Sequence, residues 1–574
     1  MDDLPPASTT DPGKQPLPRR RLPAWLVAAL FAVVAGALVF RLYLTEGYVS
    51  NFIFVTLLTA ALLAALILAT HKPLASLVAL TSFIAVVSAT SYVKYQATTV
   101  ALHSWDFVYY AGSWDTVAGW WHGHPGAAAV LVTGFAGMTA GAWLIGRFEA
   151  RSLARKWALT GCATCLLLAA AGERWRGERP HMLYNFPDWH WSSFLISFNE
   201  TAEAILRGSL IEAASKSNTA SFAENEACTP STKPPHVILI HEESVGPPSL
   251  FPQLKFDPAI LSLFNSFDGR MYKMRVETFG GGSWLTESSV LLGLSSQFFG
   301  GMKHFIQYFT AGRLRDTLPL AMENCGYRTV MFYPAFKGFF GNARFFETIG
   351  FGEIFDRKAQ GAKSDWESDR FYFNNTLDEI GRHVAVSQKP LFTYIQTMSA
   401  HWPYDIAFQP GVEVPGGGPG THPEINEYLR RLSLAKIDYD DLKQKLQERF
   451  PQERFLIMHY GDHHALPIAY LFGYREDADV KDMDFAPDSP AMTTYYAVDG
   501  INYVPPTPPA IDIVDVGYLG AILLDAARLP MPASWRERLR LMHACGGRYF
   551  DCPQRNAVLA FHRRLIESGL LPRF

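Results

Sequence analysis

The chain has 574 residues, 49% of them apolar, and a formal net charge of only −3. It contains no block of basic residues, so nucleic acid is not expected as a partner. The longest uncharged apolar runs lie in the first 172 positions, whereas the remainder has the composition of an ordinary globular domain. We therefore expect a membrane-anchored protein with one large water-soluble domain.

Five apolar stretches approach the length of about 20 residues that a helix needs to cross a bilayer. They follow a Pro- and Arg-rich segment, residues 1–21, which we expect to be a disordered cytoplasmic tail. Together they predict a five-helix transmembrane domain over residues 22–172, with spans at Leu22–Phe40, Asn51–Thr70, Pro73–Val93, Pro125–Ile145 and Leu153–Gly172. The fifth span is the weakest, because Arg155 and Lys156 intrude at its start and its uncharged part is short.

The basic residues before the first span predict its orientation. Lys14 and Arg19–Arg21 lie there, and loops rich in Lys and Arg stay in the cytoplasm. Five crossings then place everything after about residue 173 outside the cytoplasm, whereas four crossings would place it inside. The topology prediction therefore depends on the fifth span. Residues 173–235 are expected to form a connector helix followed by a Ser/Thr/Pro-rich linker.

Four of the six cysteines lie beyond the predicted spans. Cys545 and Cys552 could close a small loop, which would leave Cys228 to pair with Cys325. The alternative is that all four are unpaired thiols. An even number of cysteines fits an oxidising compartment outside the cytoplasm.

Residues 236–574 alternate short apolar runs with helical segments, a pattern that predicts an α/β domain with a mostly parallel central sheet. The expected strands are 236–240, 328–333, 391–396 and 455–459, and a long charged helix is expected over 427–450. Ligands of open α/β sheets bind outside the carboxyl ends of the strands. In this chain, polar side chains directly follow the predicted strands.

Three of these polar residues are candidate metal ligands. Glu243 follows the first strand, with Glu242 beside it as an alternative, and Asp462 and His463 follow the fourth strand. We predict that they hold one divalent cation together with the hydroxyl of Ser283. This mixed oxygen and nitrogen set suits Mn²⁺ or Zn²⁺, and Mg²⁺ is a further possibility.

Ser283 follows three consecutive glycines and begins a segment with helical character. The free N–H groups and the positive dipole end of a helix attract anions such as phosphate. A cation beside the hydroxyl would lower its pKa and fix it for attack. We therefore predict Ser283 as the nucleophile, with Thr286 as the fallback.

Further polar residues are candidates for binding the substrate. His401 follows the third strand and could protonate a leaving oxygen or hold a phosphate oxygen. His464 could do the same, or could orient its neighbour His463. The remaining candidate substrate-binding residues are Lys337, Asn342 and Trp366.

With these residues in place, the sequence resembles the alkaline phosphatase/sulfatase superfamily, and specifically its membrane-anchored transferases. That branch includes lipoteichoic acid synthases, phosphoglycerol transferases of periplasmic glucans and phosphoethanolamine transferases of lipid A. The resemblance covers the whole chain and is carried by the segments Val237–Ser244, Gly281–Leu294, Thr397–Tyr404 and Gly461–His463, and less closely by Gly350–Asp356 and Trp366–Asp369.

The resemblance bears on the identity of the nucleophile. In this branch a Glu follows the nucleophile by four positions, and Glu287 then points to Ser283. The branch commonly uses Thr, so Ser283 is a departure that keeps Thr286 as an alternative. No Cys-x-Pro-x-Arg run of the kind that sulfatases modify surrounds Ser283, which argues against sulfate-ester hydrolysis.

The resemblance implies a metal-dependent enzyme of the bacterial inner (cytoplasmic) membrane with a periplasmic catalytic domain. Such an enzyme moves phosphoglycerol from phosphatidylglycerol, through a phospho-Ser or phospho-Thr intermediate, to a glycan or lipid of the envelope. The Glu-Ser and His-x-Pro-Tyr segments favour phosphoglycerol over phosphoethanolamine transferred from phosphatidylethanolamine. The same fold could also serve phosphodiester hydrolysis or a non-catalytic sensor role. No oligomeric state follows from the sequence.

Overall fold

The computed structural model describes residues 21–46, 49–98, 100–108, 118, 121–122, 125–150, 155–173, 189–216, 220–222, 228–230, 232–337, 343–364, 366–472 and 486–573. The described residues fall into two compact units. One comprises those up to residue 96 together with 121–194, and the other comprises 97–118 and everything from residue 195 onward. The predicted tail, apart from Arg21, part of the predicted connector, and the predicted substrate residue Asn342 lie outside the described residues.

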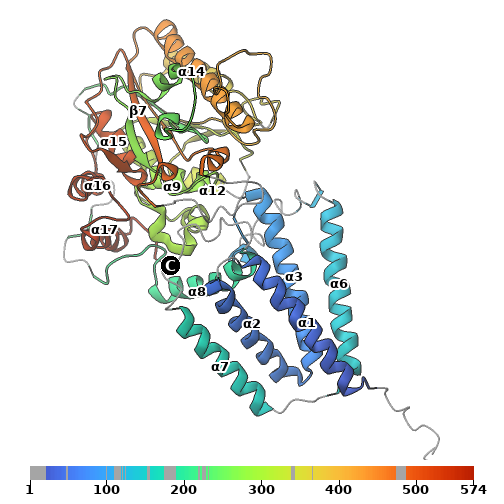
Figure 1. Ribbon diagram of the computed structural model, residues 1–574. Coiled ribbons are helices and arrows are strands. Elements are labelled where there is room, and N and C mark those ends of the chain that lie inside the picture. The colour runs from blue at the N-terminus through green and yellow to red at the C-terminus, as the bar shows by residue number, and fades with distance from the viewer. Residues whose placement is uncertain are drawn as a thin grey trace, which may run out of the picture. The chain divides into compact units, whose positions relative to one another are not determined.

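The first unit is built from apolar helices: α1 (Ala24–Thr45), α2 (Val49–Thr70), α3 (Pro73–Thr98), α6 (Pro125–Phe148) and α7 (Arg155–Glu173) (Figure 1). Four helices are long and apolar enough to cross a membrane, and their spans agree with the first four predictions: Ala24–Thr45, Asn51–Thr70, Pro73–Gln96 and Ala128–Phe148.

The fifth predicted span is shorter than expected. The apolar part of α7 covers only Lys156–Ala170. The reason is that Arg155 and Lys156 occupy the first turn of the helix. The prediction of five spans is therefore corrected to four helices of spanning length within the described residues, with α7 as a shorter apolar helix that packs against α2.

The side chain of Glu149, which follows α6, caps the start of α3. The backbone N–H groups of Leu74 and Ala75, at the start of α3, donate to Glu149 Oε1 and Oε2, each at 2.8 Å. The first N–H groups of a helix have no partner within the helix, and an unsatisfied group is costly where water is absent. Glu149 thus accepts hydrogen bonds from N–H groups that would otherwise have no partner at the start of α3.

The second unit is organised around one eight-stranded sheet with the order β4-β3-β5-β1-β6-β7-β2-β8. The run β4-β3-β5-β1-β6 is parallel, and β7 is antiparallel to both of its neighbours. This confirms the predicted mostly parallel sheet. The strands are β1 (His236–Glu242), β2 (Tyr272–Arg275), β3 (Arg328–Phe332), β4 (Glu353–Phe355), β5 (Leu391–Gln396), β6 (Phe455–Gly461), β7 (Thr493–Ile501) and β8 (Ile513–Asp515).

The central strand β1 is buried along its whole length. A strand covered on both faces has no polar side, so its sequence is a continuous apolar run rather than an alternation. The helices of this part of the chain are α8 (His190–Arg207), α9 (Ser283–Leu292), α10 (Ile306–Thr310), α11 (Leu318–Asn324), α12 (Ala343–Thr348), α13 (Asp369–Val386), α14 (Pro423–Arg449), α15 (Leu519–Ala526), α16 (Ala533–Ala544) and α17 (Arg555–Glu567).

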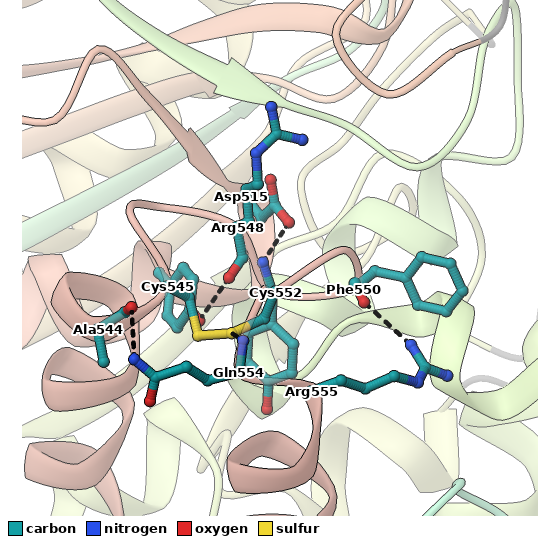
Figure 2. Close-up of a disulfide and its surroundings, with 10 residues drawn as sticks. Asp515, Ala544, Cys545, Arg548, Phe550, Cys552, Gln554 and Arg555 are labelled. Atoms are coloured by element: carbon teal, nitrogen blue, oxygen red, sulfur yellow. Dashed lines mark hydrogen bonds between the residues drawn. A yellow bond between two sulfur atoms is a disulfide. The ribbon is translucent and has the colours of Figure 1, made fainter.

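Two disulfides link the second unit, Cys228–Cys325 and Cys545–Cys552. Both predicted pairings are thereby confirmed. Figure 2 shows the second of them between the end of α16 and the segment before α17, where Gln554 Nε2 also donates to the carbonyl of Ala544 at 3.2 Å. The two remaining cysteines, Cys162 and Cys165, lie unpaired in α7.

Candidate active site

The candidate site lies where β1, β6 and α9 meet. β1 and β6 are parallel neighbours in register, with Glu242 opposite Gly461. The residues that follow the two strands therefore emerge side by side at the carboxyl edge of the sheet. Gly461 permits this close approach, because a Cβ at that position would lie 1.7 Å from the carbonyl oxygen of Val245.

The glycine loop delivers Ser283 to this edge. Gly280, Gly281 and Gly282 have φ angles of 67°, 155° and 79°, a conformation that residues with a side chain rarely adopt. The chain then enters α9, of which Ser283 is the first residue. Its hydroxyl donates to Glu243 Oε2 at 2.8 Å and lies 3.2 Å from His463 Nε2.

Asp462 is completely buried beside these groups. Its Oδ1 accepts hydrogen bonds from the backbone N–H groups of Ser244 and His463, at 2.7 and 2.8 Å. Its Oδ2 lies 3.2 Å from His463 Nε2. Burial alone would raise the pKa of Asp462, but the neighbouring His463 and His241 and these hydrogen bonds hold it below its ordinary value. The carboxylate is therefore ionised.

The orientation of His463 is fixed from its other side. Its Nδ1 lies 2.9 Å from the backbone carbonyl oxygen of His464. A carbonyl oxygen can only accept, so Nδ1 carries the proton, and the lone pair of Nε2 faces Asp462 and Ser283. This tautomer is the one that a metal-binding histidine needs.

The donor set fits a divalent cation. Ligand atoms of His241, Glu243 and Asp462 all lie within 4.8 Å of one another, and all three residues are buried. Ligands about 2.0–2.2 Å from one Zn²⁺ ion lie roughly 3.0–3.5 Å apart, which agrees with the 3.2 Å separations here. Asp462 Oδ2 is buried and has no hydrogen-bond partner among the described residues, as expected of an oxygen that serves a cation.

The fallback nucleophile Thr286 is turned into the protein. It is fully buried one turn into α9, and its hydroxyl donates to the backbone carbonyl of Asp462 at 2.8 Å. It therefore holds the Asp462 segment against α9 instead of facing a substrate. The alternative ligand Glu242 is also turned away, because it accepts from Tyr495 OH at 2.9 Å and lies 3.0 Å from His459 Nδ1.

His464 does not have the position that a substrate-binding residue needs. Its side chain is fully buried, and its Nε2 donates to the carbonyl of Thr493 at 2.6 Å. A Cβ on Gly246 would lie 2.3 Å from its ring, which shows how closely the backbone covers it. We therefore correct the predicted substrate contact. The backbone carbonyl of His464, not its imidazole, contributes to the site by orienting His463.

His401 lies on a partly exposed turn after β5, and its Nδ1 lies 2.6 Å from the carbonyl oxygen of Trp402. The turn is anchored by Asp369, whose Oδ1 accepts from the backbone N–H groups of Met398 and Ser399 at 3.2 and 3.0 Å. Burial raises the pKa of Asp369 to about 7. Within the described part of the chain no hydrogen bond joins His401 to Ser283, so its predicted role stays a prediction.

Two other predicted substrate residues lie on the surface. The side chain of Trp366 is 41% exposed, and Lys337 Nζ forms an ion pair with Glu347. Neither has a hydrogen bond or ion pair with Ser283 or Asp462 among the described residues. Their roles also stay predictions.

One residue at the site was missed by the sequence analysis. His241 is fully buried, and its Nε2 lies 3.2 Å from Asp462 Oδ2. It precedes Glu243 by two positions, and residues two apart on a strand share a face. The two-residue spacing from Glu243 could have identified His241 as a candidate ligand. It did not stand out, because β1 is buried on both faces and shows no alternation of polar and apolar residues.

A protein-family model covers part of the candidate site. The Sulfatase family model matches residues 274–484, which include Ser283, Asp462 and His463 but not Glu243. A Haemophilus influenzae protein, named only as uncharacterized, is 24% identical over 314 residues, which are 52% of this chain and 54% of that protein. The chain thus matches about half the length of this curated relative.

Solved structures with similar folds include two transferases. The phosphoglycerol transferase GacH of Streptococcus pyogenes, in complex with sn-glycerol-1-phosphate, has a TM-score of 0.46 and 16% identity, with 59% of this chain and 86% of that chain covered. The lipooligosaccharide phosphoethanolamine transferase EptA of Neisseria meningitidis has a TM-score of 0.49 and 12% identity, with coverage of 89% and 97%. The stretch from 274 to 484, which the Sulfatase family model matches, supplies the serine and the Asp-His pair of the candidate site.

Proposed function

We propose that this protein is a metal-dependent phosphotransferase of the bacterial cytoplasmic membrane that works through a phospho-Ser283 intermediate. The donor would be phosphatidylglycerol, and the acceptor a hydroxyl of an envelope glycan or lipid. One observation carries the proposal: the Ser283 hydroxyl lies at a helix N-terminus, 2.8 Å from Glu243 Oε2 and 3.2 Å from His463 Nε2.

Glu243, Asp462, His463 and Ser283 would hold the cation, Mn²⁺ or Zn²⁺ rather than Mg²⁺ in our proposal. When bound, the cation would supply positive charge that favours the ionised hydroxyl and the phosphoryl oxygens. The protein would supply the remaining groups. The first N–H groups of α9 and the positive end of its dipole would favour a phosphoryl group bound beside Ser283, and the glycine loop would keep side chains out of that approach.

The first step forms the bond between Ser283 Oγ and phosphorus and breaks the bond from phosphorus to the diacylglycerol oxygen. The serine proton would pass to Glu243, whose Oε2 accepts it in a hydrogen bond at 2.8 Å, and the diacylglycerol oxygen takes up a proton. We assign this second proton to His401 in its imidazolium form, in which Nδ1–H donates to the carbonyl of Trp402 and Nε2–H would supply the proton. In the second step the acceptor hydroxyl replaces Ser283 on phosphorus.

The proposed location follows from the helices and the disulfides. Four helices are long enough to cross a membrane, and two disulfides link the sheet-containing unit. Disulfides persist outside the cytoplasm, so we place the catalytic unit on the periplasmic side and the N-terminus in the cytoplasm. A membrane anchor would keep the site close to a donor that cannot leave the bilayer.

The test is incubation of the purified full-length protein with Mn²⁺ and either phosphatidylglycerol or phosphatidylethanolamine, each labelled in its headgroup. We expect the glycerol label to stay on the protein and to move to an added acceptor. Retention of the ethanolamine label would identify phosphatidylethanolamine as the donor instead of phosphatidylglycerol. Release of free glycerol phosphate at the same rate with and without acceptor would show a hydrolase instead.

A further inference from the structure

His241 lies among the buried ligand atoms of the site, but the proposed ligand set of Glu243, Asp462, His463 and Ser283 does not include it. It lies on β1, fully buried, and its Nε2 is 3.2 Å from Asp462 Oδ2. It precedes Glu243, the first residue of the turn after β1, by two positions. The two residues and Asp462 bring one ligand atom each into a group no wider than 4.8 Å.

The hydrogen bonds around His241 Nδ1 determine which nitrogen of the ring carries the proton. His241 Nδ1 lies 3.0 Å from Tyr394 OH. Tyr394 OH in turn donates to Glu287 Oε1 at 3.2 Å, so the phenol oxygen is left to accept from Nδ1–H. Glu287 is held in place by Gln307, whose Nε2 donates to Glu287 Oε2 at 2.8 Å.

Tyr460 is compatible with the same arrangement. Its hydroxyl lies 3.0 Å from His241 Nδ1 and 3.2 Å from Tyr394 OH. When it donates to Tyr394, its own oxygen also faces Nδ1 as an acceptor. The proton of the neutral imidazole is then on Nδ1, and in that form the lone pair of Nε2 points at Asp462 Oδ2.

Electron-rich atoms thus converge on one point. The lone pair of His241 Nε2 and the ionised Asp462 Oδ2 are 3.2 Å apart and buried, and among the described residues neither has a hydrogen-bond partner. The lone pair of His463 Nε2 lies another 3.2 Å from the same oxygen. Such atoms repel one another unless a proton or a metal cation lies between them, and buried donor atoms without hydrogen-bond partners suit a metal cation.

We propose that His241 Nε2 is a ligand of the cation held by Glu243, Asp462 and His463, so that this site has two imidazole ligands. Tyr394 and Glu287 are then positioning residues that fix the tautomer of His241, the arrangement common behind metal-binding histidines. A second imidazole favours Zn²⁺ over Mg²⁺, which prefers oxygen ligands. The inference rests on the metal site of the proposed function and specifies its coordination and selectivity.

The direct test counts the imidazole ligands. Full-length protein in detergent is stripped of metal and reloaded with one equivalent of Zn²⁺, and X-ray absorption at the zinc edge resolves the scattering from imidazole rings. We expect two rings in the wild-type protein and one in His241→Gln. His459→Gln is the matched control, because His459 is equally buried, on β6, with its Nδ1 2.9 Å from Tyr495 OH; two rings are expected there.

Zn²⁺ affinity, measured by competition with a chelator, gives a second readout. Tyr394→Phe keeps the ring and removes only the hydroxyl, and we expect it to weaken Zn²⁺ binding by about 10–100-fold. His241→Gln should weaken Zn²⁺ binding more than Mg²⁺ binding. One imidazole in the wild-type spectrum would overturn the inference, as would equal effects of His241→Gln and His459→Gln. The wild-type spectrum decides even where a variant fails to fold.

Failure of this inference is distinguishable from failure of the proposed function. A labelled phospho-Ser283 adduct together with a single imidazole ligand would overturn the role of His241 and leave the transferase standing. Two imidazoles without any adduct would support the ligand and refute the transferase.

Discussion

At the scale of single residues, the chemistry centres on a hydroxyl held between a carboxylate and an imidazole. Ser283 Oγ already donates to Glu243, and His463 presents an unprotonated nitrogen on its other side. Serine and threonine both carry a hydroxyl on Cβ, so Ser283 can serve as the proposed nucleophile.

Replacement of the two candidate hydroxyls separates their roles. We expect Ser283→Ala to abolish labelling of the protein by the lipid headgroup. Thr286→Val should retain labelling and lose about 1–3 kcal/mol of stability, because the buried carbonyl of Asp462 then loses its donor. Labelling and thermal unfolding of both variants check this. Labelled Ser283→Ala together with unlabelled Thr286→Val would transfer the nucleophile role to Thr286.

Asp369 makes the stability of the His401 turn depend on pH. Burial raises its pKa from 3.8 to about 7. Between about pH 4 and 7 the unfolded chain has released a proton that the folded chain keeps, so the contribution of this group to stability is present at low pH and is lost as the pH rises toward 7. Asp369→Asn can still accept from Met398 and Ser399 but cannot titrate.

We therefore expect the wild-type protein to lose more stability than Asp369→Asn when the pH is raised from 5 to 7.5. Thermal unfolding midpoints of the full-length proteins at several pH values measure the difference. Identical pH dependence of the two proteins would contradict the raised pKa.

The residue-level prediction from sequence had a clear limit. Glu243, Asp462 and His463 could be singled out because each follows an apolar strand, and the fold rule places strand ends together. His241 could not, because its partners Tyr394 and Asp462 come from or follow the two strands beside it. Only the register of three strands, which no local pattern encodes, brings them together. The burial of His464 was hidden for the same reason.

At the scale of elements, the site depends on the close passage of β6 past the turn after β1. Gly461 ends β6, and a Cβ there would lie 1.7 Å from the carbonyl oxygen of Val245. Any side chain must push the two segments apart. Asp462, the next residue, would move with the strand.

We expect Gly461→Ala to destabilise the fold by about 1–3 kcal/mol and to weaken metal binding. Gly381→Ala is the control, because it lies in α13 with its nearest neighbours 3.7 Å away, and alanine favours a helix. Thermal unfolding and Zn²⁺ affinity of the two variants measure the contrast. Unchanged Zn²⁺ affinity in Gly461→Ala would show that the strand passage does not position Asp462.

The bounds of strands with a clear residue pattern could be predicted from the sequence, whereas the conformation of turns could not. β5 has the predicted bounds, 391–396, because β-branched and aromatic residues fill it. Ser244, which follows Glu243, lies in a turn with a positive φ of 61° that no local pattern predicts. That conformation is set by its backbone hydrogen bond to Asp462, a contact between segments far apart in the chain.

At the scale of the whole molecule, the side of the membrane on which the catalytic unit lies is the main question. The sequence predicted five spans, and the described residues contain four helices of spanning length and the shorter α7. An even or odd number of crossings decides the side. The disulfides provide an independent indication, because the cytoplasm would keep these four cysteines reduced.

The two disulfides should differ in their effect on stability. Cys228–Cys325 joins residues 97 apart and Cys545–Cys552 joins residues 7 apart. Loop-closure entropy predicts that loss of the first costs roughly 2 kcal/mol more than loss of the second. Unfolding of the Cys→Ser pairs measures this, and alkylation of whole cells before lysis shows whether the bonds exist there. Free thiols in cells would place the domain in the cytoplasm.

The decisive measurement is the mass of the peptide that carries Ser283, after the full-length protein has been incubated with Mn²⁺ and phosphatidylglycerol and quenched in acid. We expect a glycerophosphoryl adduct on Ser283 that is absent after chelation of the metal and absent in Asp462→Asn. An unmodified Ser283 in protein that has consumed the lipid, or an adduct on another residue, would contradict the proposed mechanism.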